Sequence, residues 1–104
     1  ETTAALVDAI RESDYWERSA IFIVYDDNGG RWDHVAPPKL DRWGLGVRTP
    51  AIVISPFAKR GYVDHTPYEM TSVIAFIERR WNLRPLTARD SRAADFTNAF
   101  EFRR

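Results

Sequence analysis

The sequence predicts an α/β fold. Two short apolar runs, residues 20–24 and 51–54, are rich in Ile and Val and have the composition of strands buried on both faces. Two longer segments, residues 2–12 and 66–81, repeat apolar side chains at the spacing of one helix face. Helices that flank such strands are typical of an α/β sheet.

The first helix, over residues 2–12, is expected to pack on the sheet. Its apolar positions share one face: Ala5, Leu6, Ala9 and Ile10. The strand at residues 51–54 ends at Ser55, which Pro56 follows directly. No Gly-x-Ser-x-Gly pattern surrounds this serine, so we interpret it as a structural turn and not as a nucleophile.

The helix over residues 66–81 has the clearest boundary signals. Thr66 and Glu69 have the spacing of a capping box, and Pro67 occupies the first helical position. Asn82 and then Pro85 end the helix. A brief helix is expected to begin at Thr87, followed by an extended tail. The aromatic side chains of this tail are expected to pack back onto the sheet: Phe96, Phe100 and Phe102.

An acid pair directly follows the first strand. Asp26 and Asp27 are adjacent, and adjacent side chains on a regular strand point to opposite faces. They converge only if the strand ends between them, and Gly29 and Gly30 favour such a break. Carboxylate oxygens suit a divalent metal ion. The alternative is a solvated turn, because Asn28 followed by glycine is a strong hairpin signal.

Both histidines and one arginine are further candidates for a site. His34 follows Asp33, whose carboxylate can accept the imidazole N–H and orient the ring. His65 directly precedes the helix predicted at 66–81, whose N-terminus favours anions. Arg48 lies just before the second strand, where a guanidinium can bind phosphate. The alternatives are structural hydrogen bonds for the histidines and a solvated rim for the arginine.

Composition limits the classes of function. The 104 residues bound the chain to one domain at most, and 44% hydrophobic residues suffice for a core. Fifteen acidic residues balance fifteen basic ones, so bulk charge gives no indication of a nucleic-acid partner. The absence of cysteine excludes disulfides and Cys-type zinc sites. No apolar run approaches the roughly 18 residues of a transmembrane helix.

Residues 25–38 closely resemble a stretch of the bacterial phosphoesterase family, Tyr-Asp-(Asp/Glu)-x-Gly-Gly-x-(Tyr/Trp)-Asp-His-Val-x-Pro-Pro. That family includes the phosphatidylcholine-type phospholipases C and related acid phosphatases, within the alkaline phosphatase superfamily. The resemblance continues in order through residues 44–50, 54–59, 61–66, 71–73, 76–78 and 86–90. It covers nearly the whole chain and departs from the family at Asn28, where His or Ser is common.

The resemblance implies a fold and a set of site residues. The fold would be the C-terminal part of an alkaline-phosphatase-like domain, with a mixed, largely parallel sheet flanked by helices. Residues 1–104 would be a single segment of an incomplete domain, without the upstream part that carries the nucleophile. Asp26 and Asp27 would be ligands of a divalent metal ion, and His34 and His65 would belong to the catalytic site.

The function implied by the resemblance is hydrolysis of phosphoric esters by metal-assisted phosphoryl transfer. The substrate would be a phosphate ester, either a phospholipid diester or a monoester, and the protein would be secreted or periplasmic. The alternative is a non-catalytic α/β interaction domain in which the acidic stretch is only a turn. We expect the 104-residue chain alone to be inactive and only marginally stable, since a sheet without its neighbours exposes edges and apolar faces.

Overall fold

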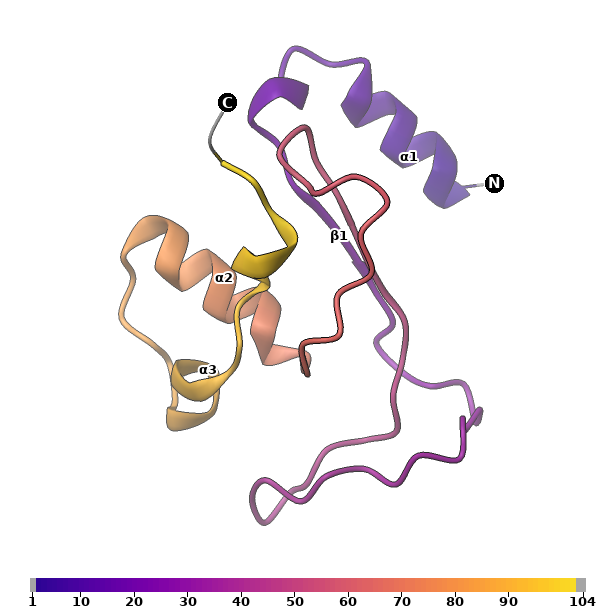
Figure 1. Cartoon of the computed structure of the whole chain (residues 1–104), viewed down its shortest axis with the longest axis vertical. Helices are drawn as coiled ribbons and strands as arrows, with labels where there is room; N and C mark the ends of the chain where they lie inside the picture. Colours follow the sequence, from indigo (N-terminus) through magenta and orange to yellow (C-terminus); the bar gives the residue numbers. More distant parts are fainter. Residues whose placement is uncertain (1, 103–104) are drawn as a thin grey trace.

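The structure is a computed structural model that describes residues 2–102. Its elements are α1 (Thr2–Arg11), η1 (Trp16–Arg18), β1 (Ile21–Val24), β2 (Ala51–Ile54), α2 (Thr71–Trp81), α3 (Ala88–Arg92) and η2 (Phe96–Ala99). Figure 1 shows α2, α3 and η2 gathered on one side of the strand pair, with α1 at one end of it. A long loop between β1 and β2 extends from the other end. The predicted α/β class is confirmed.

The two strands pair antiparallel, with Ile21 opposite Ile54 and Val24 opposite Ala51. This is the only sheet in the described residues, so the largely parallel sheet that we expected is not present there. Parallel strands need a crossover connection, usually a helix, and residues 25–50 form no helix. The antiparallel register places the end of β1 and the beginning of β2 at the same end of the strand pair.

Aromatic side chains form the core between the strand pair and the C-terminal segments. The ring of Phe22 lies 5.1 Å from Phe76, 5.2 Å from Phe96 and 6.0 Å from Phe100, between centroids. Phe96 and Phe100 are only 4% and 6% exposed, which confirms that they pack back onto the sheet. Phe102 stacks on Phe100 at 5.1 Å but remains 54% exposed, so it packs against the outer side of this cluster and not into the core.

The start of α2 differs from the prediction. The helix begins at Thr71, and the capping box between Thr66 and Glu69 does not form. The Thr66 N–H donates to the Asp64 carboxylate at 2.9 Å, and the Glu69 carboxylate accepts from Arg89 at 2.7 Å. The Glu69 carboxylate and the Thr66 N–H, which a capping box would join, therefore each have another partner. The helix begins only at Thr71.

The other helix boundaries follow the sequence signals. Asn82 ends α2 in the left-handed conformation, with φ 51°, and its N–H donates back to the last turn. Thr87 caps α3 through its hydroxyl, which accepts from the Arg89 N–H, while the Asp90 carboxylate accepts the Thr87 N–H at 2.9 Å. This reciprocal pair is a capping box, and it starts the brief helix that was expected at Thr87. Ser55 also behaves as a turn residue, because its hydroxyl accepts the Phe57 N–H at 3.1 Å and its carbonyl accepts the Ala58 N–H at 3.2 Å.

α1 forms as predicted but does not pack on the sheet. None of its residues is buried, and Leu6 is 62% exposed. Its apolar spacing therefore predicted the helix correctly and its packing wrongly.

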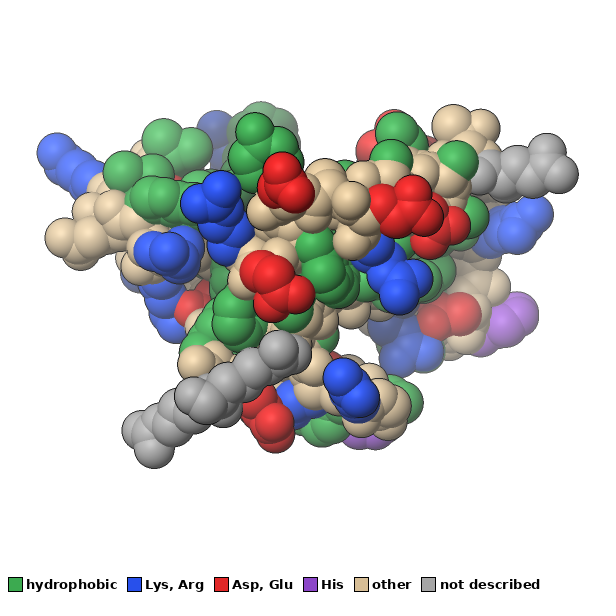
Figure 2. Space-filling model, turned by 90° about the horizontal axis from the view of Figure 1, so that it is seen from above, with side chains coloured by type: hydrophobic (Ala, Val, Ile, Leu, Met, Phe, Trp, Pro, Cys, Tyr) green, Lys and Arg blue, Asp and Glu red, His purple; other side chains and the backbone are tan. Residues whose placement is uncertain are grey.

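Figure 2 shows one face of the molecule, on which acidic, basic and apolar side chains are interspersed. Within residues 2–102, no helix is long and apolar enough to cross a membrane.

The loop from residue 25 to residue 50 contains no helix or strand, and most of it is exposed. Its far limb is tied to α3, because Arg89 donates to the Gly44 carbonyl at 3.1 Å and pairs with Asp41 at 3.4 Å. Loops of this length without secondary structure of their own are uncommon and are often functional. The loop is therefore the first place to look for a site.

Candidate functional site

A cavity of about 600 Å³ lies where β1 ends and β2 begins. The pairing of Val24 with Ala51 brings the residues after β1 against those before β2. The lining residues come from these two segments: Tyr25, Asp27, Asn28, Gly29, Arg31, Trp32, Asp33, Arg48, Thr49 and Pro50. Most of them are exposed, so the cavity is open to solvent and carries both acidic and basic groups.

One wall of the cavity is a tight turn. The Asn28 carbonyl accepts the Arg31 N–H at 3.1 Å, and the Asn28 side chain donates to the Arg31 carbonyl at 3.0 Å. The two central residues, Gly29 and Gly30, have φ of 60° and 74°. Positive φ at both central positions is the requirement of a type I′ turn, which glycine meets without strain. A turn is thus present, but its central residues are Gly29 and Gly30, one position later than the Asn28–Gly29 pair that the sequence indicated.

The acid pair follows the end of β1, as predicted. Asp27 lines the cavity, and its Oδ1 accepts the Gly29 N–H at 2.6 Å. Asp26 is exposed beside it and is not among the lining residues. Both carboxylates supply the oxygen ligands that a divalent cation prefers. Their convergence on one ion stays a prediction.

The donor set is right in type and short in number for a metal ion. No group of three or more His, Cys, Asp and Glu side chains that could hold a metal occurs within residues 2–102. Hard divalent cations take six or more oxygen ligands, of which water can supply several. A complete site built on Asp26 and Asp27 would therefore need water and further protein ligands from outside the described residues.

An ion pair between two lining residues, Arg48 and Asp33, forms another part of the cavity wall. Arg48 Nε donates to Asp33 Oδ2 at 2.6 Å, and its Nη2 lies 2.6 Å from the same oxygen. The Arg48 hydrogen bond holds the pKa of Asp33 below its ordinary value. The second oxygen of Asp33 accepts the Val35 N–H at 3.3 Å. Arg48 therefore lies at the cavity, as a lip of it, with its guanidinium held by a carboxylate.

His34 lies next to the cavity but does not line it. Its backbone has φ of 65°, and its ring centroid is 4.9 Å from that of Trp32. The Trp32 indole N–H donates to the Val35 carbonyl at 3.0 Å, which fixes this ring pair on the loop. Asp33 bonds Arg48 and Val35, so it does not orient the imidazole as we expected. A catalytic role for His34 stays a prediction.

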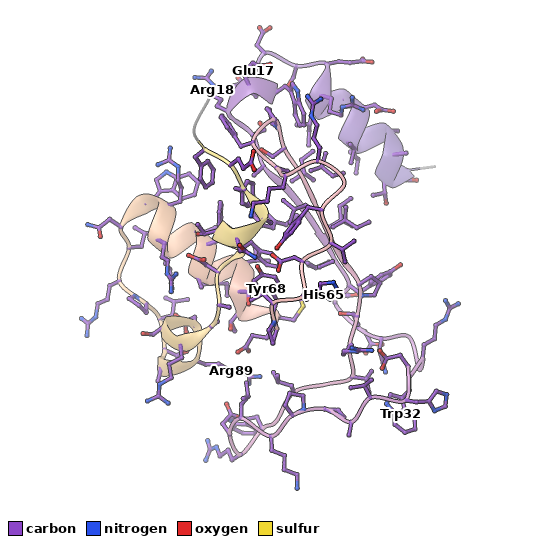
Figure 3. The ribbon with its side chains drawn as sticks, viewed as in Figure 1. Glu17, Arg18, Trp32, His65, Tyr68 and Arg89 are labelled. Atoms are coloured by element: carbon purple, nitrogen blue, oxygen red, sulfur yellow. The ribbon has the colours of Figure 1, made fainter. Side chains whose placement is uncertain are left out.

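His65 lies on the segment that precedes α2 and is exposed. Because α2 begins at Thr71, His65 is not at a helix N-terminus, and that part of the prediction is wrong. Figure 3 shows His65 close to Tyr68 and well away from Trp32 on the long loop. The described chain therefore does not bring the two histidines together, and a catalytic role for His65 also stays a prediction.

A partly buried polar network beside His65 was missed from the sequence. The Asp64 carboxylate accepts the Tyr68 hydroxyl at 2.7 Å, the Thr66 N–H at 2.9 Å and the Asn98 amide at 3.3 Å. Burial raises the pKa of Asp64, but these hydrogen bonds outweigh burial and lower that pKa to about 2. Burial and the Asp64 carboxylate raise the pKa of Tyr68 to about 12. No local signal connects Asp64 with Asn98, which lies far along the chain.

Several phospholipases C are similar to this chain. A non-hemolytic phospholipase C of Burkholderia pseudomallei is 34% identical over 86% of the chain. A second, of Pseudomonas aeruginosa, is 30% identical over 98% of it, and phospholipase C B of Mycobacterium tuberculosis is 33% identical over 94%. A non-specific phospholipase C1 of Arabidopsis thaliana is 32% identical over 92%.

The matched part is a small share of each relative. The chain spans 17% of the Burkholderia protein, 20% of the Pseudomonas protein and 25% of the Mycobacterium protein. The Burkholderia alignment extends over 122 positions, more than the 104 residues of this chain, so that relative has insertions within the matched part. The Phosphoesterase family matches residues 1–84, which include β1, β2, the acid pair and both histidines. The chain belongs to the Phosphoesterase family.

Proposed function

We propose that the chain is the metal-binding, C-terminal part of a phosphoric ester hydrolase of the phospholipase C or acid phosphatase type. Family membership and the similarity to phospholipases C support this proposal. The observation that carries it is the cavity, where Asp27 and the ion-paired Arg48 line one open space. An acidic ligand and a fixed cation in one cavity are the groups that a phosphate ester and its metal ion need.

Each candidate residue has a role in this proposal. Asp26 and Asp27 would hold a divalent cation, which binds a phosphoryl oxygen and lowers the pKa of the attacking hydroxyl. His34 and His65 would act in the catalytic site once the rest of the domain is present. The nucleophile, the remaining ligands and the other strands of a largely parallel sheet would come from the upstream part of the domain.

The substrate in this proposal is a phosphate ester, and the names of the relatives favour a phospholipid over a monoester. A secreted or periplasmic location would suit a phospholipid substrate. The 104-residue chain alone should not hydrolyse p-nitrophenyl phosphate or phosphatidylcholine, because no nucleophile is assigned to it. Robust hydrolysis by the purified chain would show that the nucleophile lies within these residues and would overturn the proposed division of the site.

Metal binding by the chain tests the proposal directly. Mn²⁺ binding, followed by water-proton relaxation, should be weak but saturable in the wild-type chain. Asp26→Asn and Asp27→Asn should each weaken it about tenfold or more, since each removes a charged ligand. Asp14→Asn is the matched control, because Asp14 is exposed and lies before β1. Equal binding by all four proteins would favour the interaction-domain alternative, in which the acidic stretch is only a turn.

A further inference from the structure

Arg48 is the cavity group whose position is best defined. Two of its guanidinium nitrogens lie 2.6 Å from one oxygen of Asp33, and both residues line the cavity with Asp27. Pro50 and the pairing of Val24 with Ala51 set the backbone that leads to Arg48. Both ends of this side chain are therefore fixed, although most of its surface is exposed.

We propose that Arg48 binds the phosphoryl group of the ligand in this cavity and that Asp33 is its positioning residue. The inference rests on the proposed function and adds a phosphate contact to it. Nε and Nη2 of Arg48 face Asp33, which leaves N–H groups on the guanidinium to donate to a second acceptor. A guanidinium donates two parallel hydrogen bonds to phosphate oxygens, a geometry that a lysine ammonium does not reproduce.

The charges of the cavity explain why a phosphate needs this arginine. Asp27 and Asp33 both line the cavity, and carboxylates repel a phosphate unless a cation lies between them. The acid pair can share one cation, but Asp33 lies on the other side of the turn and needs its own. Arg48 neutralises Asp33 and keeps donors available. Without Arg48, Asp33 would be an unpaired negative charge beside the ligand.

Arg31 is the other arginine of the cavity, and the structure favours Arg48 over it. The Arg31 backbone forms part of the turn with Asn28. Its side chain has no hydrogen bond or ion pair within residues 2–102. An unfixed arginine loses side-chain entropy when it binds, whereas Arg48 is already ordered by Asp33. The two arginines therefore provide an internal comparison.

Phosphate affinity measured on variants shows which of the two arginines, Arg48 or Arg31, binds the phosphoryl group. Inorganic phosphate, which stands for free phosphate, and glycerophosphocholine, which stands for a lipid headgroup, would be titrated into the full chain with and without Mn²⁺. Binding would be followed by ³¹P NMR and calorimetry. We expect Arg48→Gln to raise the dissociation constant about 10- to 100-fold, the usual loss for a hydrogen bond to a charged group. Arg48→Lys should keep more of the phosphate affinity than Arg48→Gln but less than the wild type. Arg84→Gln, at an exposed arginine outside the cavity, should bind phosphate as the wild type does.

The role of Asp33 has its own readout. The Arg48 Nε–H resonance should exchange slowly with water in the wild-type chain and rapidly in Asp33→Asn. Asp33→Glu should recover slow exchange and part of the phosphate affinity, which a general structural defect would not allow. Circular dichroism would confirm that each variant is folded. If Arg48→Gln does not fold, Arg48→Lys is used in its place for the phosphate titration.

The outcomes distinguish this inference from the proposed function. Loss of phosphate binding in Arg48→Gln with unchanged Mn²⁺ binding supports the inference. Phosphate binding that persists in Arg48→Gln, or that is lost instead in Arg31→Gln, overturns it and leaves the metal site untouched. A wild-type chain that binds Mn²⁺ but neither phosphate compound also overturns it. Absent Mn²⁺ binding would overturn the proposed function alone, since phosphate binding through Arg48 is measured separately. Preference for glycerophosphocholine over inorganic phosphate would assign the headgroup as the source.

Discussion

The C-terminal unit (residues 71–100) and the cavity loop (residues 25–50) are built on different principles. The C-terminal unit contains every residue that is fully buried in the described chain, and its buried polar groups are partnered with few exceptions. The cavity loop buries none of its residues and is held by a turn, one ion pair and the contacts of Arg89. The difference teaches that this chain separates the part that holds the fold from the part that contains the candidate site.

The contrast is clearest in how each region treats its carboxylates. Glu78 and Asp90 are 6% and 3% exposed, and both accept the Leu86 N–H, at 3.2 and 2.8 Å. Their oxygens therefore serve α2, α3 and the segment that joins them. Asp26 and Asp27 are exposed, and only Asp27 bonds a neighbouring N–H. Carboxylates with oxygens left open to solvent can accept a ligand, whereas those of the C-terminal unit cannot.

Removing a core ring should have the largest effect. Phe96→Ala deletes a buried side chain that contacts Phe22 and stacks on Tyr68 at 4.1 Å, and should cost about 3–5 kcal/mol. Leu40→Ala, in the cavity loop, should change stability by less than about 0.5 kcal/mol because Leu40 is exposed. Urea unfolding followed by circular dichroism measures both. Phe96→Leu provides a smaller loss where Phe96→Ala does not fold. Equal losses of stability in Phe96→Ala and Leu40→Ala would show that the cavity loop contributes to the fold as much as the C-terminal unit does.

The Asp64 network should give the next largest effect, and it depends on pH. The pKa of Asp64 is about 2 in the folded chain against an ordinary 3.8, so folding favours its ionised form. That stabilisation is present above the ordinary pKa and is lost as pH falls from about 4 towards 2. Asp64→Asn should therefore cost about 2 kcal/mol at pH 7 and progressively less in acid. Urea midpoints at pH 7, 5 and 3 test this, with Asp14→Asn as the exposed control. A difference that stays constant with pH would contradict the ionic origin.

Glu78→Gln should have a smaller effect of opposite sign. Burial, and next the neighbouring Asp90, raise the pKa of Glu78. A carboxyl whose folded-state pKa is raised binds its proton more tightly when folded, so stability decreases as pH rises through that pKa. Glutamine cannot ionise, keeps an oxygen for the Leu86 N–H and adds a donor towards Asp90. The variant should be at least as stable as the wild type at pH 7 and lose part of the pH slope. Glu12→Gln, at an exposed position, should behave as the wild type, and a destabilised Glu78→Gln would count against this account.

Local patterns predicted most of the elements correctly. The apolar runs predicted the position of both strands but not their exposure, since no residue of β1 or β2 is buried. The brief helix predicted from Thr87 forms as α3, with Thr87 as its N-cap. The start of α2 was wrong because the partner of Glu69 is Arg89, a tertiary contact that no local pattern contains. The packing of α1 was wrong because periodicity shows which side chains share a face and not whether a surface covers it.

For the candidate site, too, local features could be predicted from the sequence and tertiary contacts could not. The turn and the position of Asp27 after β1 follow from adjacent residues, and both could be read from the sequence. The pairing of Arg48 with Asp33 could not, because it depends on the antiparallel register of β1 and β2. The sequence had instead suggested that Asp33 orients His34. The tertiary fold decides which nearby group a charged side chain selects.

The smallest effect on stability should come from the turn itself. Gly30 has φ of 74°, which an alanine adopts only at a cost of about 1–2 kcal/mol, whereas Gly46 in the same loop has no positive φ. An added Cβ meets no atom within 4 Å at either glycine, so the two substitutions differ only in backbone strain. Because the loop packs little, Gly30→Ala can relax by opening the turn and should change the free energy of unfolding, measured in urea, by less than about 0.5 kcal/mol. It should still weaken Mn²⁺ binding, since the Gly29 N–H no longer orients Asp27, while Gly46→Ala leaves binding unchanged. If Gly30→Ala instead destabilises the whole chain, the turn supports the fold, and the loop is more than a carrier of the site.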